Sequence, residues 1–271
     1  MNIAIMVFTF LIGIVIGSFL NVCIYRIPLE ESIAKNGSAC MSCGAKLTII
    51  DLIPVFSYLV LRGKCRHCKA KFSAQYPIVE TLTGVLFLLL YVKFRLNYLI
   101  IVYAALIAIL IVITMIDYKH MIIPNGLVIA GLVLGVAQLL VSIFMPGVFS
   151  IAGIENIWHN NTWLDYVIGF FAGGLPLLLI AVFSTFVLKK EAIGGGDIKL
   201  MAFAGLILGW KLIIPAYFIG IVIGAIVSVV LMATGKRKRG DEIPFGPFLC
   251  FGIAVSIFFG SEIINWYLGM F

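Results

Sequence analysis

Long runs of apolar residues, separated by short polar segments, dominate the chain. A helix needs about 20 apolar residues to cross ~30 Å of hydrocarbon, and lipid requires every backbone polar group to be paired within the protein. The pattern therefore predicts an all-α polytopic membrane protein with about eight transmembrane helices, the sixth of them short. The predicted spans are 2–22, 77–95, 98–116, 122–145, 164–188, 198–210, 212–234 and 245–268.

The segment between the first two spans, residues 23–76, is polar and predicts a small soluble insert. We therefore expect three parts: a first transmembrane helix at 1–22, the insert at 23–76 and a multi-helix membrane domain at 77–271. The first span has no basic residues before it and no small-x-small cleavage site, so we expect it to stay in the membrane. The outward loop 146–163 carries Trp158 and Trp163, which are typical of interfacial anchors.

Composition and charge support a membrane protein and set its orientation. The chain is 63% hydrophobic and 11% charged, whereas soluble domains have about 25% charged residues. Sixteen of its 19 Lys and Arg residues lie on one side of the predicted membrane, and only Lys93, Arg95 and Lys211 lie on the other. The positive-inside rule places the insert in the cytoplasm and both termini outside. The run Lys236–Arg239 is interpreted as an anchor at the lipid bilayer, and we expect no nucleic-acid partner despite the net charge of +7.

Four cysteines in the insert form two C-x-x-C pairs, Cys40/Cys43 and Cys65/Cys68. Two such pairs can give one metal ion a closed tetrahedral site of the structural zinc type. A reducing cytoplasm argues against two disulfides, and a metal would supply much of the folding free energy of so small an insert. Redox-active dithiols and plain buried cysteines remain alternatives. Cys23 and Cys250 lie in or beside apolar spans and are interpreted as packing residues.

Two aspartates stand at the ends of apolar runs, where a carboxylate is costly and therefore indicates function. Asp117 ends the run at 99–116, and Asp197 follows three glycines and opens another run. Both are predicted at the cytoplasmic side. Two carboxylates within about 3 Å of each other share one proton, so that one can activate water while the other donates a proton. Such a pair could hydrolyse a peptide bond.

Structural alternatives exist for these acids. Asp197 could be a helix cap, and Asp117 could pair with Lys119 or Lys199. Glu80, near the start of the second span, is either an interfacial carboxylate or a counter-charge for a substrate amine. The chain has three histidines and none lies in mid-membrane, so a Ser–His site lacks its base.

Several motifs together resemble the type IV prepilin peptidases, which are G-x-G-D intramembrane aspartyl proteases. The signature occurs here as Gly194-Gly195-Gly196-Asp197. The other motifs are Gly17-Ser18-Phe19-Leu20-Asn21-Val22-Cys23-Ile24-Tyr25-Arg26-Ile27-Pro28, the double C-x-x-C insert, Tyr76-Pro77-Ile78-Val79-Glu80, Asp197-Ile198-Lys199-Leu200 and Pro244-Phe245-Gly246-Pro247. Their order fits across nearly the whole chain. Many relatives carry aspartates at the positions of Lys119 and Asn125, which leaves Asp117 without a competing acid nearby.

The resemblance implies a bifunctional enzyme of the inner membrane. Members cut the basic leader from type IV prepilins and pseudopilins at the cytoplasmic face, and those with the cysteine insert methylate the new N-terminus with S-adenosylmethionine. It implies that Asp117 and Asp197 are catalytic and that Cys40, Cys43, Cys65 and Cys68 hold zinc. Gly194 and Gly196 would let an extended substrate strand approach, Lys199 would steady the charge of the dyad, and Glu80 would hold or deprotonate the substrate amine.

Two other classes of function remain open at this point. An ion-coupled transporter would use the aspartates as a proton relay and the insert as a gate, although its acids would normally lie in mid-bilayer. A membrane thiol oxidoreductase would cycle the two C-x-x-C pairs between dithiol and disulfide.

Overall fold

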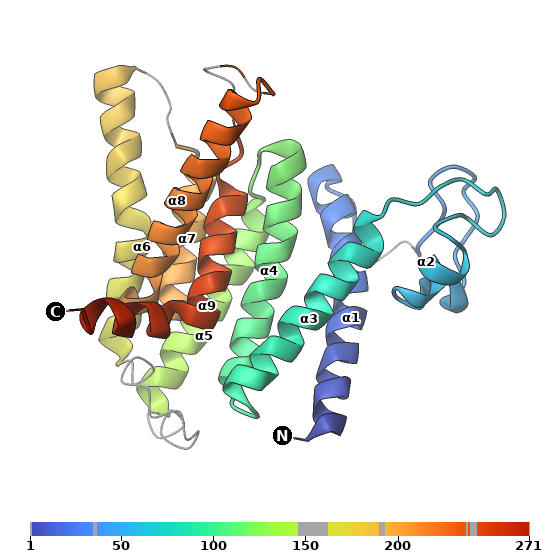
Figure 1. The fold of residues 1–271 in the computed structure, drawn as a ribbon, viewed down its shortest axis with the longest axis horizontal. Helices are drawn as coiled ribbons and strands as arrows, with labels where there is room; N and C mark the ends of the chain where they lie inside the picture. Colours follow the sequence, from blue (N-terminus) through green and yellow to red (C-terminus); the bar gives the residue numbers. More distant parts are fainter. Residues whose placement is uncertain are drawn as a thin grey trace. The chain divides into compact units, whose positions relative to one another are not determined.

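A computed structural model describes residues 2–34, 37–145, 162–189, 193–236, 238 and 243–270. Across these residues the secondary structure is helical, apart from two isolated β-bridges in the insert. The chain divides into two compact units, Met1–Ile100 and Ile101–Phe271 (Figure 1). The expected division at residues 22 and 76 follows predicted membrane boundaries and stays a prediction.

The first unit is built on two long helices, α1 (Ile3–Arg26) and α3 (Gln75–Phe94), which pack side by side (Figure 1). Asn2 caps α1, since its Oδ1 accepts a hydrogen bond from the Ala4 N–H (3.0 Å). Glycine lets the two backbones touch: a Cβ at Gly17 would lie 2.7 Å from the Cα of Glu80. Glu80 is therefore held at the contact between the two helices.

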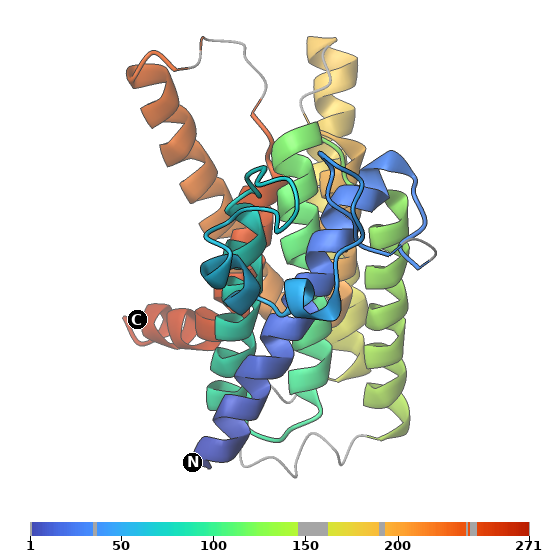
Figure 2. The same cartoon turned by 90° about the vertical axis from the view of Figure 1, so that its right-hand side faces the viewer.

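The insert connects α1 to α3 and lies beside the ends of the helices that it joins (Figure 2). Its folded parts are short. Because a segment this small buries little apolar surface, it depends on other stabilising interactions. The helical turns are the 3-10 helices η1 (Ile27–Leu29) and η2 (Ile49–Leu52) and the α-helix α2 (Phe56–Val60).

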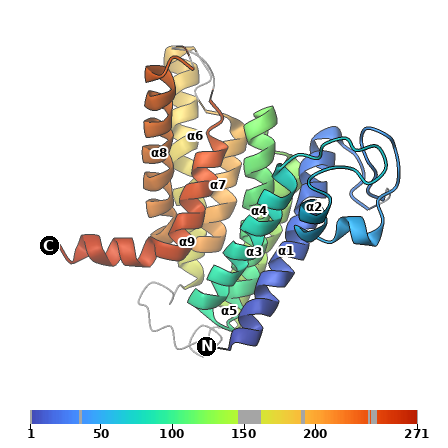
Figure 3. The ribbon, with the colours of Figure 1, turned by 45° about the vertical axis from the view of Figure 1, so that its right-hand side comes forward.

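The second unit is a bundle around one short helix. Its long helices are α4 (Leu99–His120, which starts just before the unit boundary), α5 (Asn125–Phe144), α6 (Trp163–Phe183), α8 (Trp210–Ala233) and α9 (Gly246–Leu268). The helix α6 continues into a π-helical turn, η4 (Ser184–Leu188). The short helix is α7 (Gly195–Leu208), which contacts α5, α6, α8 and α9 (Figure 3).

Seven helices among the described residues are long and apolar enough to cross a membrane, one fewer than the sequence predicts. The difference is the sixth predicted span, 198–210, which is the helix α7. Its 14 residues extend only about 21 Å at 1.5 Å per residue, less than the ~30 Å of hydrocarbon. Every residue from Leu200 to Leu208 is buried. The apolar run therefore reflects enclosure by protein.

The expected small-residue contacts between helices are present in this unit. A Cβ at Gly173 would meet the backbone of Met201, and one at Gly135 would lie 2.8 Å from the Leu206 side chain. Trp163 begins α6 and is about half exposed. Trp158, Lys190, Arg237 and Arg239, to which the sequence analysis gave topological roles, lie outside the described residues.

Candidate active site and metal centre

Asp197 is positioned by the start of the buried helix α7. Gly194 is the N-cap residue of this helix, and the Asp197 N–H donates to the Gly194 carbonyl (3.1 Å). Asp197 therefore lies in the first helical turn. The alternative interpretation, in which Asp197 caps the helix, is wrong because Gly194 holds the N-cap position. Gly196 packs closely, because a Cβ there would lie 2.9 Å from Cβ of Ile123.

Asp117 lies in the last turn of α4 and is buried, with 6% of its surface exposed. The backbone N–H of Gly246 hydrogen-bonds to its carboxylate. Gly246 is the first residue of α9, so the free N–H groups at that helix start point toward the acid. Lys199, a candidate ion-pair partner of Asp117, donates to Oδ1 of Asn125 (3.0 Å).

The two carboxylates meet at Gly246. A Cβ at this glycine would lie 2.6 Å from Oδ2 of Asp117 and 3.5 Å from Oδ1 of Asp197. The two acids, 80 positions apart in sequence, thus border one small volume that exists because residue 246 has no side chain. Burial and then the charge of Asp117 raise the pKa of Asp197 to about 7. A pair of this kind retains one proton near neutral pH.

Two further side chains surround the pair. Tyr217 of α8 and Cys250 of α9 both interact electrostatically with Asp197. The Tyr217 hydroxyl donates to the carbonyl of Gly173, which joins α8 to α6, and Cys250 hydrogen-bonds to Thr114 of α4. Tyr217 had no predicted role, and Cys250 was predicted to be a packing residue. The motif that contains Gly246 was the one sequence signal for this part of the site.

The four cysteines of the insert converge as their spacing predicts. Their Sγ atoms all lie within 4.8 Å of one another, and those of Cys40 and Cys68 are 3.8 Å apart. A tetrahedral zinc ion with bonds of about 2.3 Å needs sulfur atoms about 3.8 Å apart, so the four thiols fit zinc. The backbone N–H groups of Ser42 and Cys43 lower the pKa of Cys40 to about 6, which favours the thiolate form that binds metal.

The two C-x-x-C pairs share one local geometry. A β-bridge closes each turn, between Ala39 and Lys46 and between Lys64 and Lys71. The residue after each second cysteine has a positive φ, 71° at Gly44 and 61° at Lys69. This repeated turn directs the thiols of each pair toward the same point.

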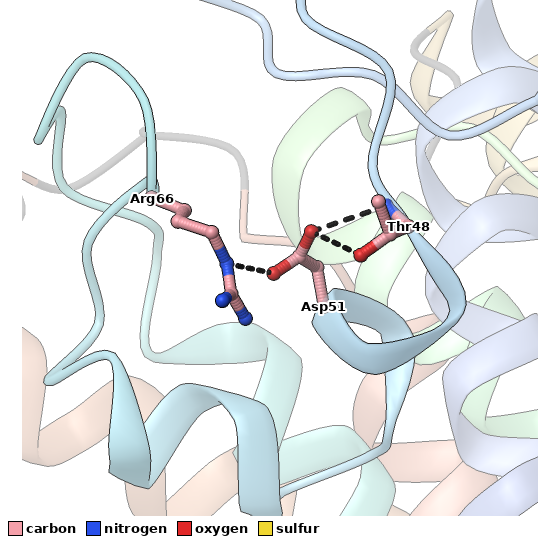
Figure 4. Close-up of polar contacts among 3 residues, drawn as sticks. All are labelled: Thr48, Asp51 and Arg66. Carbon is pink, nitrogen blue, oxygen red and sulfur yellow. Dashed lines mark hydrogen bonds and ion pairs between the residues drawn. The ribbon is translucent and has the colours of Figure 1, made fainter.

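An ion pair ties the second cysteine turn to the rest of the insert (Figure 4). Nε of Arg66 donates to Oδ1 of Asp51 (2.9 Å), and Oδ2 of Asp51 accepts from the N–H and hydroxyl of Thr48. The Asp51 side chain is 4% exposed. The hydrogen bonds from Thr48, followed by the contact with Arg66, lower the pKa of Asp51. The carboxylate is therefore a fixed anion inside the insert.

Glu80 is buried in the first unit, with 6% of its surface exposed. Its Oε2 accepts the backbone N–H of Val55 (2.7 Å), and Ser18 of α1 hydrogen-bonds to the same carboxylate. Glu80 thus joins the insert to the helix pair.

Seven candidate membrane spans among the described residues and two converging carboxylates define the class: a polytopic helical membrane protein with a paired-aspartate site. Residues 11–94 match the family model described as the bacterial peptidase A24 N-terminal domain, and residues 104–229 match that of the type IV leader peptidase family. The chain belongs to the type IV leader peptidase family. The resemblance found in the sequence is thereby confirmed.

Curated relatives match nearly the full length. The chain is 31% identical over 261 residues to the prepilin leader peptidase/N-methyltransferase of Bacillus subtilis (strain 168). This alignment covers 96% of this chain and 97% of the relative. The chain is 33% identical over 285 residues to the protein of the same name from Legionella pneumophila, covering 96% and 93% respectively. No match was found among solved structures.

Proposed function

We propose that this protein removes the leader peptide from type IV prepilins or pseudopilins and then methylates the new N-terminal amine. The convergence of Asp117 and Asp197 on Gly246 carries the peptidase half of the proposal. The names of the relatives support both halves. The excess of Lys and Arg on one side supports an active site at the cytoplasmic face of the inner membrane.

Peptide cleavage follows from two acids that hold one proton. Asp197 carries that proton, because burial and the charge of Asp117 raise its pKa to about 7, and Asp117 acts as the base. Asp117 takes a proton from water, whose oxygen attacks the scissile carbonyl directly without a covalent intermediate. Asp197 donates its proton to the carbonyl oxygen, and the tetrahedral adduct expels the amine after proton transfer from the pair. Lys199, already held by Asn125, lies two residues from Asp197 and would steady the nearby charge.

The substrate would reach this pair from the membrane. Its hydrophobic helix would enter laterally, its basic leader would stay in the cytoplasm, and the unwound segment between them would meet the two acids. Gly194 supports this path, because a Cβ there would meet only Oδ2 of Asp197, at 3.7 Å. An extended strand can therefore approach the start of α7.

Leader cleavage should lose activity as the pH rises through about 7. Burial and the charge of Asp117 raise the pKa of Asp197, so the protonated form is present below that pH and is lost above it. Above pH about 7 the pair has no proton to donate. The measurement is the kcat for a prepilin across the neutral range. A rate that stays constant through neutrality would contradict the assignment of Asp197 as the acid.

The cysteine quartet would hold a structural zinc ion. A bound zinc ion would fix the relative positions of the two cysteine turns and supply folding free energy to the insert. Cys40→Ser removes one ligand and should weaken zinc binding by more than the roughly 10- to 100-fold that loss of an outer-shell partner costs. The measurements are zinc content per chain and protease sensitivity of residues 37–74.

Cys23→Ser is the matched control for this variant, because Cys23 is a buried thiol of α1 outside the quartet. It should keep the zinc content of the native protein. Unchanged zinc in Cys40→Ser would refute the quartet as a metal site.

One assay tests the proposed function directly. Purified protein is incubated with a prepilin and S-adenosylmethionine carrying a labelled methyl group, and the N-terminus of the product is analysed by mass spectrometry. We expect a shortened chain whose new N-terminal residue carries one labelled methyl group. An intact prepilin would refute the peptidase activity, and a shortened chain without label would refute the methyltransferase.

A further inference from the structure

The first unit contains a cavity of about 460 Å³ between the insert and the two helices α1 and α3. This volume lies within the range of roughly 300–1,000 Å³ that small-molecule sites occupy. Its walls come from every part of the unit. The residues with the most informative chemistry are Ser18, Asn21, Tyr25, Asp51, Tyr76 and Glu80.

Aromatic rings form one wall of the cavity. Tyr25 of α1 and Tyr76 of α3 are stacked, with ring centroids 5.5 Å apart and planes at 13°. Phe72 meets Tyr76 edge-on at 6.5 Å. An aromatic wall of this kind suits the flat face of a nucleobase and attracts a cation at its ring faces.

The amide of Asn21 is buried, and its nitrogen and oxygen differ in their hydrogen bonds. Its Nδ2 donates to the Tyr76 carbonyl (3.1 Å), whereas its Oδ1 is buried without a hydrogen-bond partner among the described residues. Asn21 is 2% exposed. Asn21 lines the cavity. Because buried acceptors are nearly always satisfied, a small turn of this amide would offer its oxygen to a donor from a ligand.

Two carboxylates line the same cavity. Asp51 is fixed by Thr48 and Arg66 (Figure 4), and Glu80 is fixed by the N–H of Val55 at 2.7 Å. Val55 offers this N–H from a left-handed conformation, with φ of 59°. This conformation is costly for a β-branched residue, and strain of this kind clusters at functional sites. Arg66 already neutralises Asp51, so Glu80 is the carboxylate that would face a positively charged part of a ligand.

We propose that this cavity binds S-adenosylmethionine and that Glu80 accepts the proton of the substrate amine during N-methylation. The inference rests on the proposed function and gives its methyltransferase half a location. The adenine ring lies against the aromatic wall of Tyr25 and Tyr76, and its exocyclic amine donates to Oδ1 of Asn21. The sulfonium charge faces the carboxylate side.

Methyl transfer from S-adenosylmethionine to the pilin amine then needs only the donor, the amine and Glu80. The terminal ammonium of the cleaved pilin gives one proton to the Glu80 carboxylate. Its nitrogen lone pair forms the bond to the methyl carbon while the sulfur–methyl bond breaks. The electron pair of that bond stays on sulfur as a neutral thioether. The product leaves as a secondary ammonium, and Glu80 returns its proton to solvent.

This placement also assigns a task to the metal centre. Cys40 lines the cavity, and Arg66 of the second cysteine turn holds Asp51, another wall residue. The zinc quartet therefore shapes the wall of the cavity without contributing a reacting group. Loss of the metal should weaken donor binding along with the fold of the insert.

Direct binding tests the site without relying on catalysis. S-Adenosylhomocysteine is titrated into full-length protein in lipid nanodiscs and followed by calorimetry. Tyr25→Ala should weaken its binding about 10-fold, as expected for loss of a stacked base. Ser57→Trp, which places a large ring in the cavity wall, should abolish it. Glu30→Gln is the control, because Glu30 is an exposed acid close to Tyr25 in sequence. This variant should bind S-adenosylhomocysteine like the native protein.

The role of Glu80 is tested with a pilin that already lacks its leader. Glu80→Gln should lower the methylation rate roughly 100-fold, as for loss of a general base, whereas the control Glu30→Gln should methylate at the native rate. Native methylation by Glu80→Gln, or native binding by Ser57→Trp, would overturn the proposal. If Tyr25→Ala also loses leader cleavage, its fold is damaged, and S-adenosylhomocysteine binding by Ser57→Trp becomes the test of the site. A native protein that methylates nothing would instead refute the proposed function.

Discussion

Asp197→Asn should lower kcat for leader cleavage by roughly 1,000-fold, the middle of the range for losing a general acid or base. An amide at this position keeps the shape of the side chain but cannot carry the transferable proton. Asp117→Asn should cost a similar amount, because it removes the base that activates water. The double variant should be little worse than either single one, since the two acids act as a unit. The measurement is single-turnover cleavage of a purified prepilin.

Glu262→Gln is the matched control for the loss of a carboxylate. Glu262 lies near the end of α9 opposite Gly246 and contacts Ser261, so cleavage should be unchanged. Substantial residual cleavage by either Asp→Asn variant would end the dyad mechanism. That result is what an ion-coupled transporter would give, because its aspartates would have no role in peptide hydrolysis.

Gly246→Ala should lower kcat by roughly 100-fold without unfolding the protein. The new methyl group would start 2.6 Å from Oδ2 of Asp117 and 3.5 Å from Oδ1 of Asp197. It would therefore push the two carboxylates apart or occupy the place of the attacking water. Small misplacements of reacting groups cost about this much. Cleavage kinetics and thermal stability of the detergent-solubilised protein measure the two effects separately.

Gly195 and Gly196, at the start of α7, supply the comparison for Gly246. Gly195→Ala should keep near-native activity, because a Cβ there meets nothing within 4 Å. Gly196→Ala should fall between the two, since its Cβ would lie 2.9 Å from Ile123, which must move. An inactive Gly195→Ala together with an active Gly246→Ala would contradict the placement of the site at the start of α9.

The membrane helices were predictable because hydropathy and length are local properties. Seven predicted spans correspond to helices that could cross a membrane. The helix α7 was predicted as a span because burial in protein and burial in lipid select the same apolar residues. Only its length, 14 residues, distinguishes the two situations, and the predicted span at 198–210 was already the short one.

The candidate site was predictable where each residue carries its own chemical signal. Asp117 and Asp197 stand out because carboxylates are rare beside apolar runs, and Cys40, Cys43, Cys65 and Cys68 stand out by spacing. The role of Gly246 could not be read in the same way. A glycine has no chemistry of its own, and its importance comes from two carboxylates that reach it from other helices. The cavity beside Glu80 was likewise invisible, because it is formed by segments distant in sequence.

The enclosure of α7 has a consequence for the environment in which the protein works. Leu200–Leu208 contact protein neighbours, so the bilayer does not set the depth of this helix. Lipids of different chain length change the tilt of spanning helices and strain their ends. Asp197 lies in the first turn of α7, and the surrounding protein shields this helix from such adjustments. The depth of Asp197 can therefore stay constant while the spanning helices adapt to thinner or thicker membranes, whereas Asp117 shifts with its spanning helix α4.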